Sequence, residues 1–171
     1  MWKFCLPLGL LFLPYRLSAA DLRPVISREA AKYAAAWQRS DVNLIISYLP
    51  PRVVQQQGGR AAALDALNDQ FAQARSFGVN RLDAIPGQPT PPKLLGRWLA
   101  SMLPVTAVLH SAHLDLTQQT HVLALSADQG KKWFFVLLYE ITQAELISCF
   151  PEFRGKVIVP EPPAPQLKVV Y

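Results

Sequence analysis

The sequence predicts an α+β fold in which three N-terminal helices pack in a curved antiparallel sheet of four to five strands. Helical periodicity is confined to residues 27–77, whereas the segments after Gly78 alternate with period two or form short β-branched and aromatic runs. Small polar turns also separate the later apolar runs, as expected for hairpins. The chain has 171 residues, 51% of them hydrophobic, which suits one domain with a substantial core.

Residues 1–20 have the pattern of a secretory signal peptide. Lys3 precedes an apolar run over residues 4–13, and Ser18-Ala19-Ala20 offers the small residues of a cleavage site after Ala19 or Ala20. The pattern predicts an exported protein, periplasmic or secreted. Arg16 leaves a retained anchor as the alternative, so membrane contact is expected only through an uncleaved signal.

The first helix is predicted over residues 27–41, with Ser27 as its N-cap. Its apolar positions recur at i, i+3, i+4 and i+7 and form one stripe. They are Ala30, Tyr33, Ala34 and Trp37. A shorter second helix over residues 42–49, capped by Asp41, should end at Pro50-Pro51.

The segment 52–57 is short and β-branched, and Gly58-Gly59 follows it, so it is predicted as an edge strand and a turn. A third helix is predicted over residues 60–77 with an apolar face that includes Phe71, and Gly78 stands at its C-cap position. Strands are then predicted over residues 79–86, 105–117, 121–126 and 131–141.

Residues 125–139 form a hairpin in this interpretation, because a polar turn joins two apolar runs. Asp128 and Gly130 are ordinary turn residues. A phosphate-binding loop would place Ser or Thr after Lys132 and open a helix, but Trp133 follows and begins a strand.

Charge and cysteine content exclude several classes of protein. The formal net charge is +5 and the basic residues are scattered, with no run longer than Lys131-Lys132, so no nucleic-acid partner is expected. Beyond residue 20 only Cys149 remains, which excludes a cysteine-ligated zinc site. Its apolar neighbours predict a buried, inert thiol.

The order of features over residues 27–140 resembles the NTF2-like superfamily, which includes SnoaL-like and ketosteroid-isomerase-like proteins. The features are an apolar helix with Tyr33 and Trp37, then Asp41, a short helix ending near proline, a short β segment, a glycine turn and a longer helix. The resemblance implies a sheet curled into a conical pocket. The lining candidates are Tyr33, Trp37, Phe71, Trp98, Trp133 and Phe135. These side chains could instead fill the cone completely.

Isomerase-like members use a carboxylate base and an acidic donor inside the cone. Tyr33 stands about where such members place a phenol donor, but the segment that would carry the base reads VVQQQGG and holds no acid. No catalytic residue is therefore assigned. The alternative is an isomerase- or lyase-type enzyme with an atypical site, which would combine Tyr33 with Asp115 or with a histidine. The histidines are His110, His113 and His121.

No metal and no cofactor are expected, because His110 and His113 would point to opposite faces of an unbroken strand. The sequence favours a non-catalytic, exported NTF2-like domain over residues 21–145 that binds a small apolar ligand or a protein partner. A Pro-rich extension, residues 146–171, would pack on it or trail from it. The apolar residues on both faces of 133–139 suggest a homodimer through the sheet. A structural module of an envelope secretion apparatus is a further alternative.

Overall fold

The structure is a computed structural model that describes residues 21–170, and its α+β architecture confirms the predicted fold class. The predicted signal peptide lies outside the described residues. The helices are α1 (Arg23–Gln38), α2 (Val42–Ser47), α3 (Pro51–Gln56), α4 (Arg60–Ser76), α5 (Gln143–Cys149) and the 3-10 turn η1 (Pro151–Phe153). The strands are β1 (Arg81–Pro86), β2 (Lys93–Leu95), β3 (Trp98–His110), β4 (Leu114–Ser126), β5 (Phe134–Leu137) and β6 (Gln166–Val169).

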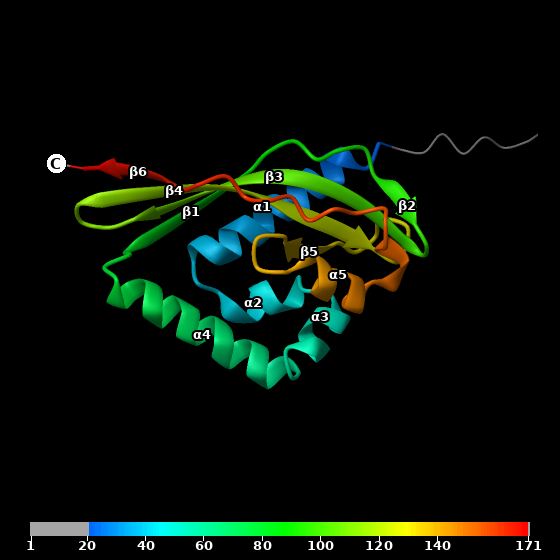
Figure 1. Ribbon diagram of the computed structural model, residues 1–171, viewed down its shortest axis with the longest axis horizontal. Helices are drawn as coiled ribbons and strands as arrows, with labels where there is room; N and C mark the ends of the chain where they lie inside the picture. Colours follow the sequence, from blue (N-terminus) through cyan, green and yellow to red (C-terminus); the bar gives the residue numbers. More distant parts are fainter. Residues whose placement is uncertain (1–20, 171) are drawn as a thin grey trace, which may run out of the picture.

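The strands form one antiparallel sheet in the order β1-β3-β4-β5, with β2 added to β3 and β6 added to β4. The long strands β3 and β4 curve over α1, and α2, α3 and α4 lie on the same side of the sheet (Figure 1). Beyond η1 the chain runs back along β4 and reaches β6 at the far end of the sheet (Figure 1).

The concave face of the sheet is an apolar surface set by strand register. Leu103 pairs with Val122, and Leu109 pairs with Leu116. Because side chains alternate between the two faces of a strand, every second residue of β3 and β4 points toward α1. One hydrophobic cluster joins this face to α1 and α2 through residues such as Ile45.

The convex face is covered at one end by α5 and η1. Phe150 and Phe153 are fully buried and stack with ring centroids 5.0 Å apart. They belong to a second hydrophobic cluster with Trp98 and Leu125, which point away from α1. Most side chains of the β5 segment are therefore covered by the chain itself, on both faces of the sheet, and the homodimer stays a prediction.

The segment 52–57 is helical, so the predicted edge strand is wrong. Pro51 stands in the first turn of α3, where its missing N–H and fixed φ favour a helix. Val53 is buried against the second cluster, and Arg52 Nη1 donates to the Cys149 carbonyl oxygen at 3.1 Å. Tertiary packing thus overrides the β preference of the two valines.

Two further boundaries differ from prediction. The first helix begins at Arg23 with a proline in its first turn, so Ser27 lies inside the helix and is not its N-cap. The predicted strands 105–117 and 121–126 have different bounds in the structure, because the chain turns at Ser111. The first part of 105–117 belongs to β3, and its last residues belong to β4, which continues through 121–126. In that turn Ser111 Oγ donates to the Leu114 carbonyl oxygen at 2.9 Å and accepts from its N–H at 3.1 Å.

Other local predictions are confirmed. Asp41 Oδ1 accepts from the Leu44 N–H at 3.1 Å and so caps α2. The hairpin forms with Leu125 opposite Phe134, and Gly130 adopts a positive φ of 89° in its turn. Within residues 21–170, no helix is long and apolar enough to cross a membrane.

Candidate ligand-binding site

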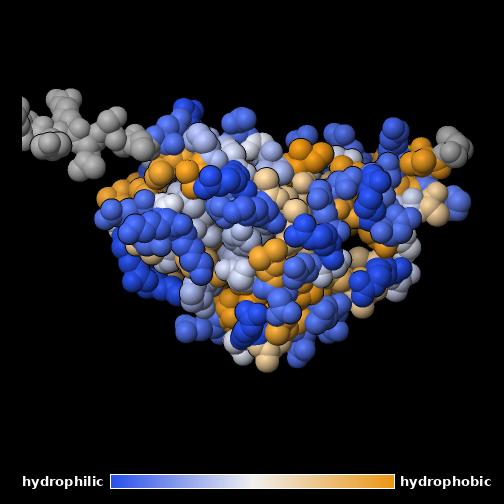
Figure 2. Space-filling model, turned by 180° about the vertical axis from the view of Figure 1, so that it is seen from behind, coloured by the Kyte–Doolittle hydropathy of each residue, from blue (hydrophilic) through white to orange (hydrophobic). Residues whose placement is uncertain are grey.

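A cavity of about 770 Å³ lies between α1, α4 and the concave face of the sheet. Its wall is mainly apolar and includes several alanines, which leave room where larger side chains would close the space. They are Ala30, Ala34, Ala74, Ala84 and Ala107. This space, called the large chamber below, has the size and lining of a small-molecule site. A hollow is visible in the surface toward the end that carries the C-terminus (Figure 2).

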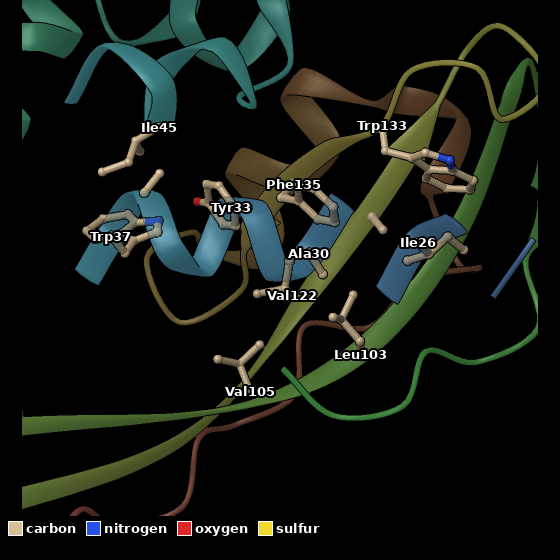
Figure 3. Close-up of a cluster of buried hydrophobic side chains, with 12 residues drawn as sticks. Ile26, Ala30, Tyr33, Trp37, Ile45, Leu103, Val105, Val122, Trp133 and Phe135 are labelled. Carbon is tan, nitrogen blue, oxygen red and sulfur yellow. The ribbon is translucent and has the colours of Figure 1, made fainter. Parts of the chain in front are cut away.

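Four of the six predicted lining residues meet in the large chamber: Tyr33, Trp37, Phe71 and Phe135. Tyr33 stacks on Phe135 with centroids 5.1 Å apart, and Trp37 lies 5.6 Å from Phe71. Figure 3 shows Tyr33 and Trp37 on the same side of α1, with Phe135 beside the phenol ring. These ring contacts fix the aromatic part of the wall.

The other two predicted lining residues, Trp98 and Trp133, do not line the chamber. Trp98 points to the convex face, where its Nε1 donates to Glu152 Oε1 at 2.7 Å. Trp133 precedes β5 and lies beside Ile26, and its Nε1 donates to the Gly130 carbonyl oxygen at 3.0 Å (Figure 3). Both tryptophans fill the core. Trp98 is at a position of β3 whose side chain points to the convex face, and the turn before β5 directs Trp133 away from the cavity.

Two buried donors in the chamber wall have no acceptor within residues 21–170: the Tyr33 hydroxyl and the Trp37 indole N–H. Tyr33 is 4% exposed and Trp37 is 8% exposed. Their polar atoms point toward one another (Figure 3), close enough for the Trp37 N–H to act on the pKa of the phenol but without the geometry of a hydrogen bond. Burial raises the pKa of the Tyr33 phenol; the nearby Trp37 N–H opposes the rise, and the negative charge of Glu140 adds to it. The phenol therefore keeps its proton at neutral pH.

A smaller space of about 240 Å³, the small chamber, adjoins the first and lies toward α2, α3 and α5. Both chambers share Tyr33, Trp37, Gln70 and Leu137, so the two donors stand where the chambers meet. Glu140 lines the small chamber, is itself exposed, and accepts from Gln70 Nε2 at 3.2 Å. Sequence reasoning missed Glu140, because no motif connects the end of a strand with a helix 70 residues earlier.

The proline-rich segment 162–165 also lines the large chamber, where it forms part of the wall beside β4. It is attached by a hydrogen bond from Gln118 Nε2 to the Pro163 carbonyl oxygen and by the pairing of β6 with β4. Composition alone indicates an extended segment here but not where it lies.

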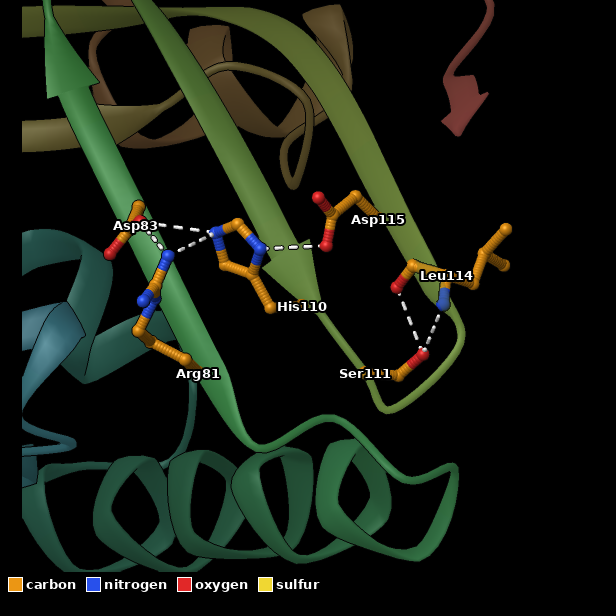
Figure 4. Close-up of polar contacts among 6 residues, drawn as sticks. All are labelled: Arg81, Asp83, His110, Ser111, Leu114 and Asp115. Atoms are coloured by element: carbon orange, nitrogen blue, oxygen red, sulfur yellow. Dashed lines mark hydrogen bonds and ion pairs between the residues drawn. The ribbon is translucent and has the colours of Figure 1, made fainter. Parts of the chain in front are cut away.

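Tyr33 does not meet Asp115 or the histidines. His110 is on the convex face, where its ring nitrogens lie 2.7 Å from Asp115 Oδ1 and 3.0 Å from Asp83 Oδ2 (Figure 4). Arg81 completes this partly buried network, which links β1, β3 and β4 on the opposite side of the sheet from Tyr33. His113 lies in the β3–β4 turn, and His121 pairs with Pro104 on the convex side. The Tyr33–Asp115 or Tyr33–histidine site considered above is therefore not formed.

Among residues 21–170, no group of three or more His, Cys, Asp or Glu side chains could hold a metal ion. Cys149 is buried, its thiol donates to Gln56 Oε1, and burial raises the pKa of the thiol, as expected for an unreactive cysteine. No protein-family model, curated protein or solved structure matches the chain.

Proposed function

We propose that the protein binds a small apolar ligand in the large chamber. The observation that carries this proposal is an apolar cavity of about 770 Å³ between α1, α4 and the concave face of the sheet. Burial of apolar surface there favours binding by about 25 cal/mol per Å². Because α1, α4 and the strands β1, β3 and β4 supply most of the wall, little ordering free energy is lost when a ligand binds.

Helices followed by a curved antiparallel sheet around an apolar cavity also support the proposal that the protein is a non-catalytic NTF2-like domain. The proposal that it is exported rests on the signal-peptide pattern of residues 1–20. The base that isomerase-like members would need is absent from α3, which carries glutamines where the resemblance requires an acid. Assembly into a homodimer stays a prediction. α5 and η1 cover the convex face behind β5, whereas the concave face keeps an apolar cavity, which favours a ligand as the occupant of that cavity.

A cavity-filling variant tests ligand binding. Ala107 lines the large chamber, and it pairs with Ala84 across β1 and β3. Ala107→Phe should occupy the space and abolish binding of a naphthalene probe measured by fluorescence. The matched control is Thr106→Phe, because neighbouring residues on a strand point to opposite faces. Equal probe binding by both variants would refute the proposed site.

Native mass spectrometry of the protein from its own host provides an independent test. A bound small molecule of constant mass, together with a chain that begins after Ala19 or Ala20, is the expected result. A protein that carries no small molecule and retains residues 1–20 would count against both ligand binding and export.

A further inference from the structure

We infer that the ligand carries an uncharged hydrogen-bond acceptor, such as a ketone or ester carbonyl, and that Tyr33 and Trp37 donate to it. This inference rests on the proposed function, because it specifies the polar group of the ligand bound in the large chamber. It goes further by assigning a chemical class to the ligand and a role to two side chains.

The two donors are placed together by helix geometry. Tyr33 and Trp37 are four residues apart on α1, so their side chains lie on one face of the helix. Their rings meet edge to face with centroids 6.2 Å apart. Both side chains line both chambers, so an atom at the junction is within reach of both donors.

The lack of partners is specific to these two side chains. The other described tryptophans, Trp98 and Trp133, donate at 2.7 and 3.0 Å. The nearby Tyr48 donates its hydroxyl to Glu29 Oε2 at 3.1 Å. Leaving a buried donor unpaired costs about 1–3 kcal/mol, so two adjacent cases in one cavity wall indicate a site that a ligand completes.

The donor chemistry determines what the ligand must present. An indole N–H only donates, and a phenol with a raised pKa also keeps a proton to donate. A single oxygen with two lone pairs can accept from both. A hydrocarbon would leave both donors unpaired, and an ammonium group offers them no acceptor.

Charge excludes a carboxylate as this acceptor. The described lining of the two chambers contains no Lys or Arg, whereas Glu140 and Glu145 line the small chamber. An anionic head would be desolvated without a counter-ion and beside negative charge. A neutral carbonyl avoids both costs and still accepts two hydrogen bonds.

The test compares three matched probes: a naphthyl alkyl ketone, the same naphthalene without the acyl group, and the corresponding naphthoate. The wild-type protein should bind the ketone at least about tenfold more tightly than the parent naphthalene, because both donors gain an acceptor. The naphthoate should bind most weakly. The infrared carbonyl stretch of the bound ketone should shift to lower frequency.

Tyr33→Phe and Trp37→Phe should each remove most of the ketone's advantage and leave the affinity for the parent naphthalene within about twofold. Because Tyr33→Phe also deletes an unpaired buried hydroxyl, it should raise Tm by about 2–4 °C. Tyr48→Phe is the matched control: its hydroxyl is already bonded, so it should leave ketone selectivity unchanged and should not raise Tm.

Equal affinities for the ketone and the parent naphthalene, unaffected by Tyr33→Phe, would overturn this inference and leave apolar ligand binding intact. Donors that bind only water would give that result. Tightest binding of the naphthoate would also overturn it. Failure of all three probes to bind would overturn the proposed function, and this inference with it.

Discussion

Gln118 of β4 donates a hydrogen bond from Nε2 to the carbonyl oxygen of Pro163 at 3.0 Å. The bond attaches the proline-rich wall of the large chamber to the sheet, next to a β6 strand that is exposed along its whole length. Four-residue strands at a sheet edge open readily, so this side-chain contact should help to keep the segment in place.

Replacing Gln118 by Met removes this donor at similar volume. We expect amide exchange over residues 166–169 to become up to about tenfold faster, because a net hydrogen bond contributes about 1 kcal/mol. An apolar probe should also leave the chamber faster. Hydrogen exchange with mass spectrometry checks the first effect, and Gln119→Met on the opposite face is the control. Unchanged exchange in the Gln118 variant would show that β6 pairing alone holds the segment.

Phe150 should be among the most important residues for stability. It is fully buried, stacks on Phe153 and contacts the ring of Trp98, so Phe150→Ala leaves a large cavity under the convex face. We expect the free energy of unfolding to fall by about 3–5 kcal/mol. Urea denaturation measures it. Phe77→Ala, at a side chain that is 75% exposed, should change it by less than about 0.5 kcal/mol. A similar loss of unfolding free energy in both variants would contradict the placement of Phe150 in the second hydrophobic cluster.

Asp41→Ala should lower the free energy of unfolding by about 1 kcal/mol, because the Leu44 N–H at the start of α2 loses its acceptor. Asp41→Asn keeps a capping oxygen and should retain most of the stability. Urea titrations of the three proteins provide the comparison. An asparagine variant as unstable as the alanine variant would mean that the carboxylate charge, not the cap, contributes the stability.

Acid should weaken the start of α5. Thr142 donates its backbone N–H and its hydroxyl to Glu145 Oε2, each at 2.7 Å, and these bonds hold the pKa of Glu145 below its ordinary value of 4.5. The folded state thus favours the carboxylate. This stabilisation is present above pH 4.5 and is lost as the pH falls through the lowered pKa.

Glu145→Gln should therefore flatten the fall of unfolding free energy below pH 4.5, measured by urea titrations over a pH series. The same substitution at the exposed Glu161 is the control. If both variants follow the wild-type curve, the hydrogen bonds between Thr142 and Glu145 do not contribute to acid sensitivity.

Much of the fold could be predicted because its signals are local. The apolar stripe of α1, the cap at Asp41 and the turn at Gly130 each depend on residues a few positions apart. The site was only partly predictable. Tyr33, Trp37 and Phe71 lie on the predicted apolar faces of their helices, so periodicity alone brings them toward the core.

Helical residues 51–56 show where local reasoning fails. Two valines and a following glycine turn favour a strand, but the segment forms α3, which packs against α5. Trp98 and Trp133 fail as lining residues for a related reason. Aromatic character predicts burial, but the face of the sheet on which a side chain is buried depends on register.

The sequence by itself determined the α+β class, the position of the N-terminal helices before the long strands and the aromatic face of α1, because periodicity and turn chemistry act over a few residues. Only the tertiary structure decided that the concave face stays hollow, that Glu140 and the 162–165 segment border the space, and that Asp115 lies on the opposite side of the sheet. Those outcomes depend on sheet curvature and on contacts between distant segments, which no short stretch of sequence encodes.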